Sequence, residues 1–155
     1  MPGHPIIGHV HLKVSDLARA IRFYQDVLGF ELQQTMGEEA AFLSFGGYHH
    51  HVGLNVWFSK EGPRPPRDAT GLFHFAILYP DRRELARAVR RLLEHGVAID
   101  GASDHGVSEA IYFRDPDGNG IEIYRDRPPE QWPRENGKPA MITEPLDIGA
   151  LLSEE

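Results

Sequence analysis

The sequence contains no cysteine among its 155 residues. A disulfide, a thiolate nucleophile and a sulfur-ligated metal are therefore excluded, and any metal must be held by nitrogen and oxygen atoms. No apolar run approaches the roughly 20 residues that span a bilayer, and the N-terminus lacks the charged and then apolar pattern of a signal peptide. We therefore expect a cytoplasmic protein that does not bind a membrane.

Positive charge is also scarce. The chain has 16 lysines and arginines against 23 acidic residues, a net charge of −7, and it lacks the basic stripe that nucleic-acid binding requires. We expect no nucleic-acid partner. Its composition, 41% hydrophobic and 25% charged, is that of a globular protein whose length fits one domain or two small modules.

What the sequence does contain is a repeat. The segments HVHLKVSDLARAI and HFAILYPDRRELARAV begin at His9 and His74, and each has an aspartate seven positions after the histidine. In each copy a strand leads into a helical stripe that ends at a glycine, and three further strands follow. The predicted fold is α+β, with two βαβββ modules at residues 1–59 and 72–126.

The remaining segments lie outside this repeat. Residues 60–71 contain three prolines and no periodicity, which predicts a linker without helix or central strand. We expect residues 127–155, the C-terminal extension, to pack on their own domain or on a dimer partner, with a short helix capped by Asp147. Three aromatic residues are predicted to lie in the core: Trp57, Phe73 and Phe75.

Strand alternation brings three metal-ligand side chains to one face. His74 alternates with apolar residues along its strand, and Glu122 lies between two isoleucines. The apolar side chains should pack under the helices, so that His74 and Glu122 share the opposite, concave face. His9 takes the same side in its own module. A single strand histidine or glutamate is more often solvated, but the joint pattern predicts a metal held by His9, His74 and Glu122.

This arrangement resembles the vicinal oxygen chelate superfamily, which includes glyoxalase I, fosfomycin-resistance transferases, bleomycin-binding proteins and type I extradiol dioxygenases. The resemblance covers residues 6 to about 126 and implies a curled mixed sheet with the metal in a groove between the modules. The segment AIYFRDPDGNGIE is similar to short catechol 2,3-dioxygenase-like enzymes. Those enzymes place a tyrosine ten residues before the metal glutamate, which implies a site role for Tyr112.

The resemblance also implies an active-site histidine on the strand before the second ligand histidine. The segment YHHHVGL offers His49, His50 and His51. Alignment of the apolar VGL favours His50, whereas strand parity places His51 on the groove face with Asn55. Both remain candidates for the catalytic base.

Further site positions follow from the same likeness. His105 is the candidate for a catalytic histidine upstream of the tyrosine, although its spacing departs from the family pattern by two residues. His11 shares the groove face with His9, and we expect His11 and Asn55 to bind substrate. Gly53 stands where glyoxalase I carries an additional carboxylate ligand, which argues for a three-ligand site and against glyoxalase chemistry.

Two imidazoles and one carboxylate on one face of a divalent metal leave adjacent positions open, as in non-haem Fe(II) oxygenases. We therefore expect a homodimeric Fe(II)-dependent extradiol dioxygenase that uses dioxygen to cleave a catecholic ring. The same ligands also bind Mn, Ni or Zn. The alternatives are another metal enzyme of the superfamily (a lyase, isomerase or transferase) and a non-catalytic protein that binds small molecules.

Overall fold

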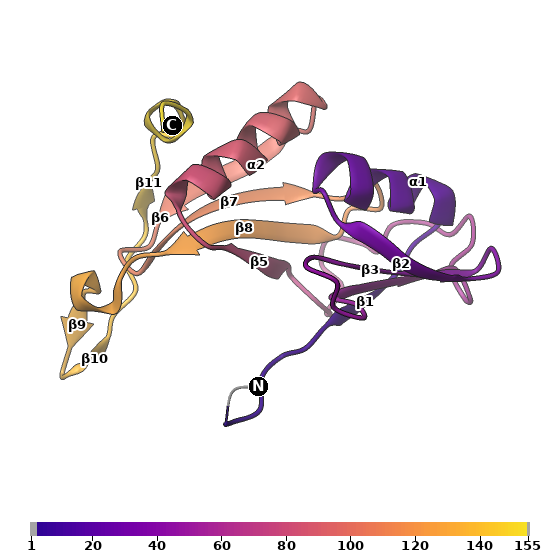
Figure 1. Ribbon diagram of the computed structural model, residues 1–155, viewed down its shortest axis with the longest axis horizontal. Helices are drawn as coiled ribbons and strands as arrows, with labels where there is room; N and C mark the ends of the chain where they lie inside the picture. The colour runs from indigo at the N-terminus through magenta and orange to yellow at the C-terminus, as the bar shows by residue number, and fades with distance from the viewer. Residues whose placement is uncertain (1–2, 155) are drawn as a thin grey trace. The chain divides into compact units, whose positions relative to one another are not determined.

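The computed structural model describes residues 3–154 and divides the chain into two compact units, Met1–Thr70 and Gly71–Glu155 (Figure 1). The segment 60–71, at whose end the division falls, contains neither helix nor strand. Within residues 3–154, no helix has the length and apolar character needed to cross a membrane.

The first unit is built around a four-stranded sheet. Its elements in chain order are β1 (Val10–Lys13), α1 (Leu17–Arg22), the π-helical turn η1 (Phe23–Val27), β2 (Glu31–Met36), β3 (Ala40–Ser44) and β4 (Val52–Asn55). The strand order is β1-β4-β3-β2, with β1 parallel to β4 and the other neighbours antiparallel. The predicted order of one strand, one helix and three strands is confirmed for this unit.

Helix α1 is capped by Asp16. The Asp16 carboxylate accepts a hydrogen bond from the Arg19 N–H at 3.0 Å, which satisfies one of the free N–H groups of the first turn. Leu17 and Tyr24 are buried against the sheet. The last turn widens into η1, and Gly29, with φ of 79°, ends the helical segment.

The second unit repeats this topology. Its elements are β5 (Phe75–Tyr79), α2 (Arg82–Glu94), β6 (Ile99–Asp104), β7 (Ser108–Arg114) and β8 (Gly120–Asp126), with β11 (Glu144–Pro145) added at one edge. The strand order is β11-β6-β7-β8-β5, and β5 runs parallel to β8 as β1 does to β4. Helix α2 lies along the curled sheet (Figure 1). These open, curled mixed sheets confirm the predicted α+β class.

The core of the second unit lies between α2 and the sheet. Helix α2 follows Asp81, whose carboxylate accepts a hydrogen bond from the Glu84 N–H at 2.8 Å. Its predicted apolar stripe is fully buried, at Leu85, Val89 and Leu92. Ile121 and Ile123 of β8 are also fully buried. Because side chains alternate along a strand, Glu122 between them points to the other face.

Two aromatic residues predicted to lie in the core are exposed. Phe73 is 81% exposed and Trp57 is 49% exposed, whereas Phe75 is buried as predicted. Strand β5 begins only at Phe75, whose ladder partner is Ile121 of β8. Phe73 therefore precedes the sheet, and Trp57 lies in the turn after β4.

The C-terminal extension packs against helix α2. It contains the 3-10 turn η2 (Pro129–Gln131), the paired strands β9 (Arg134–Glu135) and β10 (Lys138–Pro139), then β11 and helix α3 (Ile148–Leu152). Asp147 caps α3, and Leu151 is fully buried. Arg90 of α2 donates hydrogen bonds to the carbonyl oxygens of Leu152 and Glu154, so the end of the extension is tied to the helix.

Candidate functional site

His74 and Glu122 meet on one face of the second sheet. His74 immediately precedes β5, and its side chain contacts that of Glu122 on the neighbouring strand β8. His74 Nε2 lies 2.9 Å from a Glu122 carboxylate oxygen, and the two side chains are 30% and 13% exposed. A Cβ on Gly120 would lie 2.2 Å from the Phe73 carbonyl oxygen, so this approach requires glycine.

The spacing of His74 and Glu122 suits a shared metal ion. Two ligands in adjacent octahedral positions, each about 2.1 Å from the ion, lie about 3 Å apart, and these two atoms are 2.9 Å apart. The part of the chain that the structure describes, residues 3–154, contains no group of three or more His, Cys, Asp or Glu side chains that could hold a metal. His9 belongs to the other unit, so its role as a ligand stays a prediction.

Tyr112 lies beside this pair. It is directly opposite Glu122 in the antiparallel β7–β8 ladder, and its ring centroid is 5.6 Å from that of His74. Burial, followed by the charge of Glu122 and a hydrogen bond to it, raises the pKa of Tyr112 to about 12. The hydroxyl therefore keeps its proton at neutral pH and acts as a hydrogen-bonding group.

His105 joins the same group of residues. Its Nε2 atom lies 2.6 Å from the Tyr112 hydroxyl oxygen, and its Nδ1 atom lies 2.9 Å from the Ile142 carbonyl oxygen. The β6–β7 hairpin holds it there, with the His105 N–H donating to the Ser108 carbonyl at 2.8 Å. The structure thus brings together all the site residues predicted for the second module: His74, His105, Tyr112 and Glu122.

In the first unit, His50 lies against His9. Their ring centroids are 4.3 Å apart, and Phe42 packs edge-on against His50 at 5.1 Å. The Nδ1 atoms of His49 and His50 are 2.8 Å apart. Burial, and then the charge of His9 and of the other neighbouring histidines, lowers the pKa of His50. His50 is therefore a neutral imidazole at neutral pH, which can accept a proton.

The His51 ring instead contacts its own loop. Its Nδ1 atom accepts a hydrogen bond from the Phe45 N–H at 3.2 Å, and the ring stacks on Tyr48 with centroids 4.7 Å apart. Strand parity is not a guide here, because β4 begins at Val52 and His51 precedes the alternation. Of the two alternatives that the sequence leaves open, this geometry favours His50.

His11 and Asn55 lie together on β1 and β4. Asn55 Nδ2 is 2.9 Å from His11 Nε2, and burial followed by the charge of His9 lowers the pKa of His11. The His11 ring also lies over Gly53, where a Cβ would be 2.8 Å from His11 Nδ1. With the ring in this position, residue 53 has no room for a carboxylate side chain.

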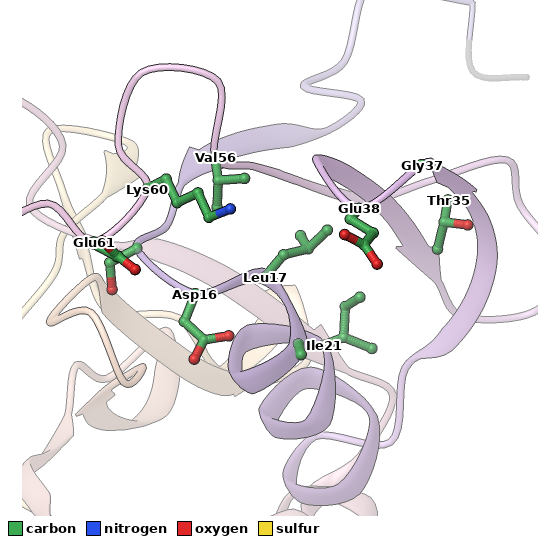
Figure 2. Close-up of a pocket in the computed structure, with 11 residues that line it drawn as sticks. Asp16, Leu17, Ile21, Thr35, Gly37, Glu38, Val56, Lys60 and Glu61 are labelled. Carbon is green, nitrogen blue, oxygen red and sulfur yellow. The ribbon is translucent and has the colours of Figure 1, made fainter.

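A cavity of about 510 Å³ lies elsewhere in the first unit (Figure 2). Its walls come from the start of α1, the β2–β3 turn and the segment after β4. Leu17 and Ile21 project from α1 toward Glu38 (Figure 2). Its lining, residues 15–18, 21, 35, 37, 38, 56, 60 and 61, includes none of the predicted site residues.

Two residues that position the site residues of the second unit were not predicted from the sequence. Ile142 contributes a main-chain carbonyl oxygen, which has no side-chain signature in a sequence. Gly120 had a signal that could have been used, since a glycine at the start of an apolar strand often marks a close backbone approach.

A family model described as the Glyoxalase/Bleomycin resistance protein/Dioxygenase superfamily matches residues 6–123. The chain belongs to this superfamily. The match ends one residue after Glu122 and spans both compact units.

Individual relatives of the chain include dioxygenases. The chain is 45% identical to the catechol-2,3-dioxygenase of Bacillus subtilis, over 96% of this chain and 51% of that protein. It is 30% identical to biphenyl-2,3-diol 1,2-dioxygenase 3 of Rhodococcus globerulus, over 79% of this chain and 64% of that protein. The chain thus spans about half to two thirds of the length of these relatives.

A solved structure supports the fold assignment. The crystal structure of a glyoxalase/dioxygenase from Nostoc punctiforme matches this chain with a TM-score of 0.65 at 25% sequence identity, covering 83% of this chain and 96% of that chain. The predicted superfamily is therefore confirmed by the family model, by the relatives and by the fold.

Proposed function

We propose that this protein is a metal-dependent extradiol dioxygenase that cleaves a catecholic ring with dioxygen. The observation that carries the proposal is the His74–Glu122 pair, separated by 2.9 Å, with Tyr112 and His105 beside it. The likeness to a catechol-2,3-dioxygenase and a biphenyl-2,3-diol 1,2-dioxygenase supports this reaction class among those of the superfamily.

His74 and Glu122 would hold the metal, with His9 as a third ligand on the basis of the sequence repeat. The Glu122 side chain is only 13% exposed, and a carboxylate removed from water requires a compensating positive charge. Fe(II) held by such ligands would supply Lewis-acid and redox chemistry toward catechol and dioxygen. Mn, Ni and Zn are the alternative metals for the same donor atoms.

The other side chains of the site handle protons and orientation. Tyr112, whose pKa is raised to about 12, keeps its hydroxyl proton and orients a substrate oxygen through a hydrogen bond. His50, whose pKa is lowered, is neutral and takes a proton from a substrate hydroxyl. His105 fixes the position of the Tyr112 hydroxyl through their 2.6 Å contact.

The residues of the first unit fit a glyoxalase less well than a dioxygenase. The superfamily resemblance assigns an additional carboxylate ligand of glyoxalase I to the position of Gly53. A Cβ at that position would lie 2.8 Å from the His11 ring, and His11 is itself held by Asn55. We therefore place this chain with the three-ligand members, and we propose that it acts as a homodimer.

Two measurements test the proposal: the metal content of the purified protein, and its ability to cleave catechol. Protein purified without oxygen is analysed for Fe, Mn, Ni and Zn, and catechol is then added under air while dioxygen uptake and yellow product are recorded together. We expect stoichiometric iron, with dioxygen consumed and product formed in equal amounts. Glu122→Ala should lose both metal and activity. Asp126→Asn alters an exposed carboxylate on the same strand and face and should retain both.

Each other outcome has a defined meaning. Bound metal without product, across several catechols, would indicate a lyase, isomerase or transferase of the same superfamily. Wild-type protein that binds no metal would indicate a binding protein. Iron retained by the Glu122→Ala variant would contradict the ligand assignment. Sedimentation of the same wild-type sample tests the homodimer.

A further inference from the structure

A segment of the C-terminal extension runs along the outer edge of the second sheet. Residues 140–146, which we call the strap, lie antiparallel to β6. The Ile142 N–H donates to the His105 carbonyl at 3.0 Å, and the Leu146 N–H donates to the Ala102 carbonyl at 3.4 Å. Between these contacts β11 pairs with the end of β6. The strap is therefore an additional edge strand.

The strap is anchored on both sides. Before it, the Trp132 indole N–H donates to the Arg127 carbonyl at 2.7 Å, and Arg127 forms an ion pair with Asp104 at 2.7 Å. After it, α3 buries Leu151 completely. None of these contacts involves His74 or Glu122. They hold the two ends of the strap and so position it beside His105.

The contact between the strap and the His105 ring determines which ring nitrogen carries the proton. His105 Nδ1 lies 2.9 Å from the Ile142 carbonyl oxygen and 3.3 Å from the Thr143 hydroxyl oxygen. A carbonyl oxygen can only accept, so Nδ1 must donate and carries the hydrogen. In the neutral ring Nε2 then has a free lone pair, and it faces the Tyr112 hydroxyl at 2.6 Å.

We propose that the strap is part of the active site, and that the Ile142 carbonyl acts as a positioning group that holds His105 in the Nδ1–H form. The catalytic meaning of this assignment rests on the proposed function, whereas the tautomer does not. Hydrogen bonding to the second nitrogen is the usual way in which proteins select a histidine tautomer and fix the ring plane. This gives the C-terminal extension a role that the repeated modules do not supply.

The test combines nitrogen NMR with kinetics. Protein labelled with ¹⁵N-histidine is loaded with Zn(II), which is diamagnetic, and the His105 signals are assigned by their loss in His105→Gln. We expect the wild-type ring to be protonated at Nδ1. Ile142→Pro removes the N–H that anchors the strap to the His105 carbonyl, and we expect the Nδ1–H form to be lost. In the Fe(II)-loaded enzyme its kcat should fall about 10- to 100-fold, as for other residues that orient an active-site group, with KM little changed.

Two variants serve as controls. Ile142→Ala retains the main-chain carbonyl and N–H of residue 142 and should keep the wild-type tautomer. Thr143→Val removes only the longer contact of 3.3 Å and should keep the tautomer. An Nε2–H tautomer in the wild-type protein overturns the proposal without any variant. Loss of the tautomer in Ile142→Pro with wild-type kcat overturns the active-site role. If the wild-type protein cleaves no catechol, the proposed function fails, and the NMR result still decides the assignment of His105.

Discussion

Replacing Gly120 by alanine should separate His74 from Glu122. The new Cβ would lie 2.2 Å from the Phe73 carbonyl oxygen and 3.0 Å from His74 Cβ, where ordinary contacts begin near 3.4 Å. The two segments must therefore move apart by about 1.2 Å, because the obstructing oxygen belongs to the main chain and cannot rotate away. Overpacking of this kind costs roughly 1–3 kcal/mol, and a displacement of about 1 Å can reduce a rate roughly 10²-fold.

Metal affinity and thermal unfolding measure the two consequences separately. Competition with a chromophoric chelator should show metal affinity at least about tenfold lower in Gly120→Ala, comparable to losing a group that orients a ligand. Its Tm should fall by about 2–12 °C, at about 2–4 °C per kcal/mol for a chain of this size. Gly101→Ala is the control, since its Cβ would meet only Tyr112 Cδ2, at 3.9 Å. A lower Tm with unchanged metal affinity would refute the view that Gly120 sets the position of His74.

Three further predictions follow from burial and charge. Glu109→Gln should destabilise the protein by about 2–3 kcal/mol in urea unfolding, because Arg125 and Arg82 lose the buried charge that they share, although Arg82 keeps its ion pair with Glu154. Asp100→Asn, in a half-exposed pair, should cost under about 1 kcal/mol. His50→Ala should lower kcat about 10²- to 10⁴-fold, and His51→Ala should instead cost about 1 kcal/mol of stability; the reverse result would reassign the base. Metal-free protein should lose stability below about pH 6.5. Folding lowers the pKa of His11, His50 and His51, so the unfolded chain binds more protons than the folded protein in this range. Equal unfolding free energies at about pH 7.5 and about pH 5.5 would contradict this prediction.

Much of the fold could be predicted because two periodicities are strong in this sequence. Alternation of apolar and polar residues separates the two faces of the central strands, so the shared face of His74 and Glu122 could be inferred from the residue pattern alone. The apolar stripe of α2 is buried as predicted. The repeated aspartates, Asp16 and Asp81, cap the two helices through the side-chain hydrogen bonds that they accept. These features depend on local geometry, which the sequence determines directly.

The parts that could not be predicted depend on where a strand begins or on contacts far along the chain. Strand parity placed His51 in the site, but β4 starts only at Val52. Phe73 matched the apolar alternation, but the strand β8 offers it no partner. The contact of Ile142 with His105 joins residues 37 positions apart through a main-chain oxygen. No pattern of side chains could have indicated that contact.

Glu109 and Glu122 lie on the neighbouring strands β7 and β8. The residues that each carboxylate contacts indicate that Glu109 has a structural role and that Glu122 is a metal ligand. Glu109 is bonded by Arg82 and Arg125, so its charge is already compensated. Among residues 3–154, Glu122 forms its one ion-pair contact with His74 and none with an arginine or lysine. Removing the charge of Glu122 should therefore cost little in metal-free protein. Glu122→Gln should change unfolding stability by less than about 1 kcal/mol while abolishing metal binding. If Glu122→Gln destabilises metal-free protein as much as Glu109→Gln does, Glu122 is a structural residue and the metal-site assignment fails.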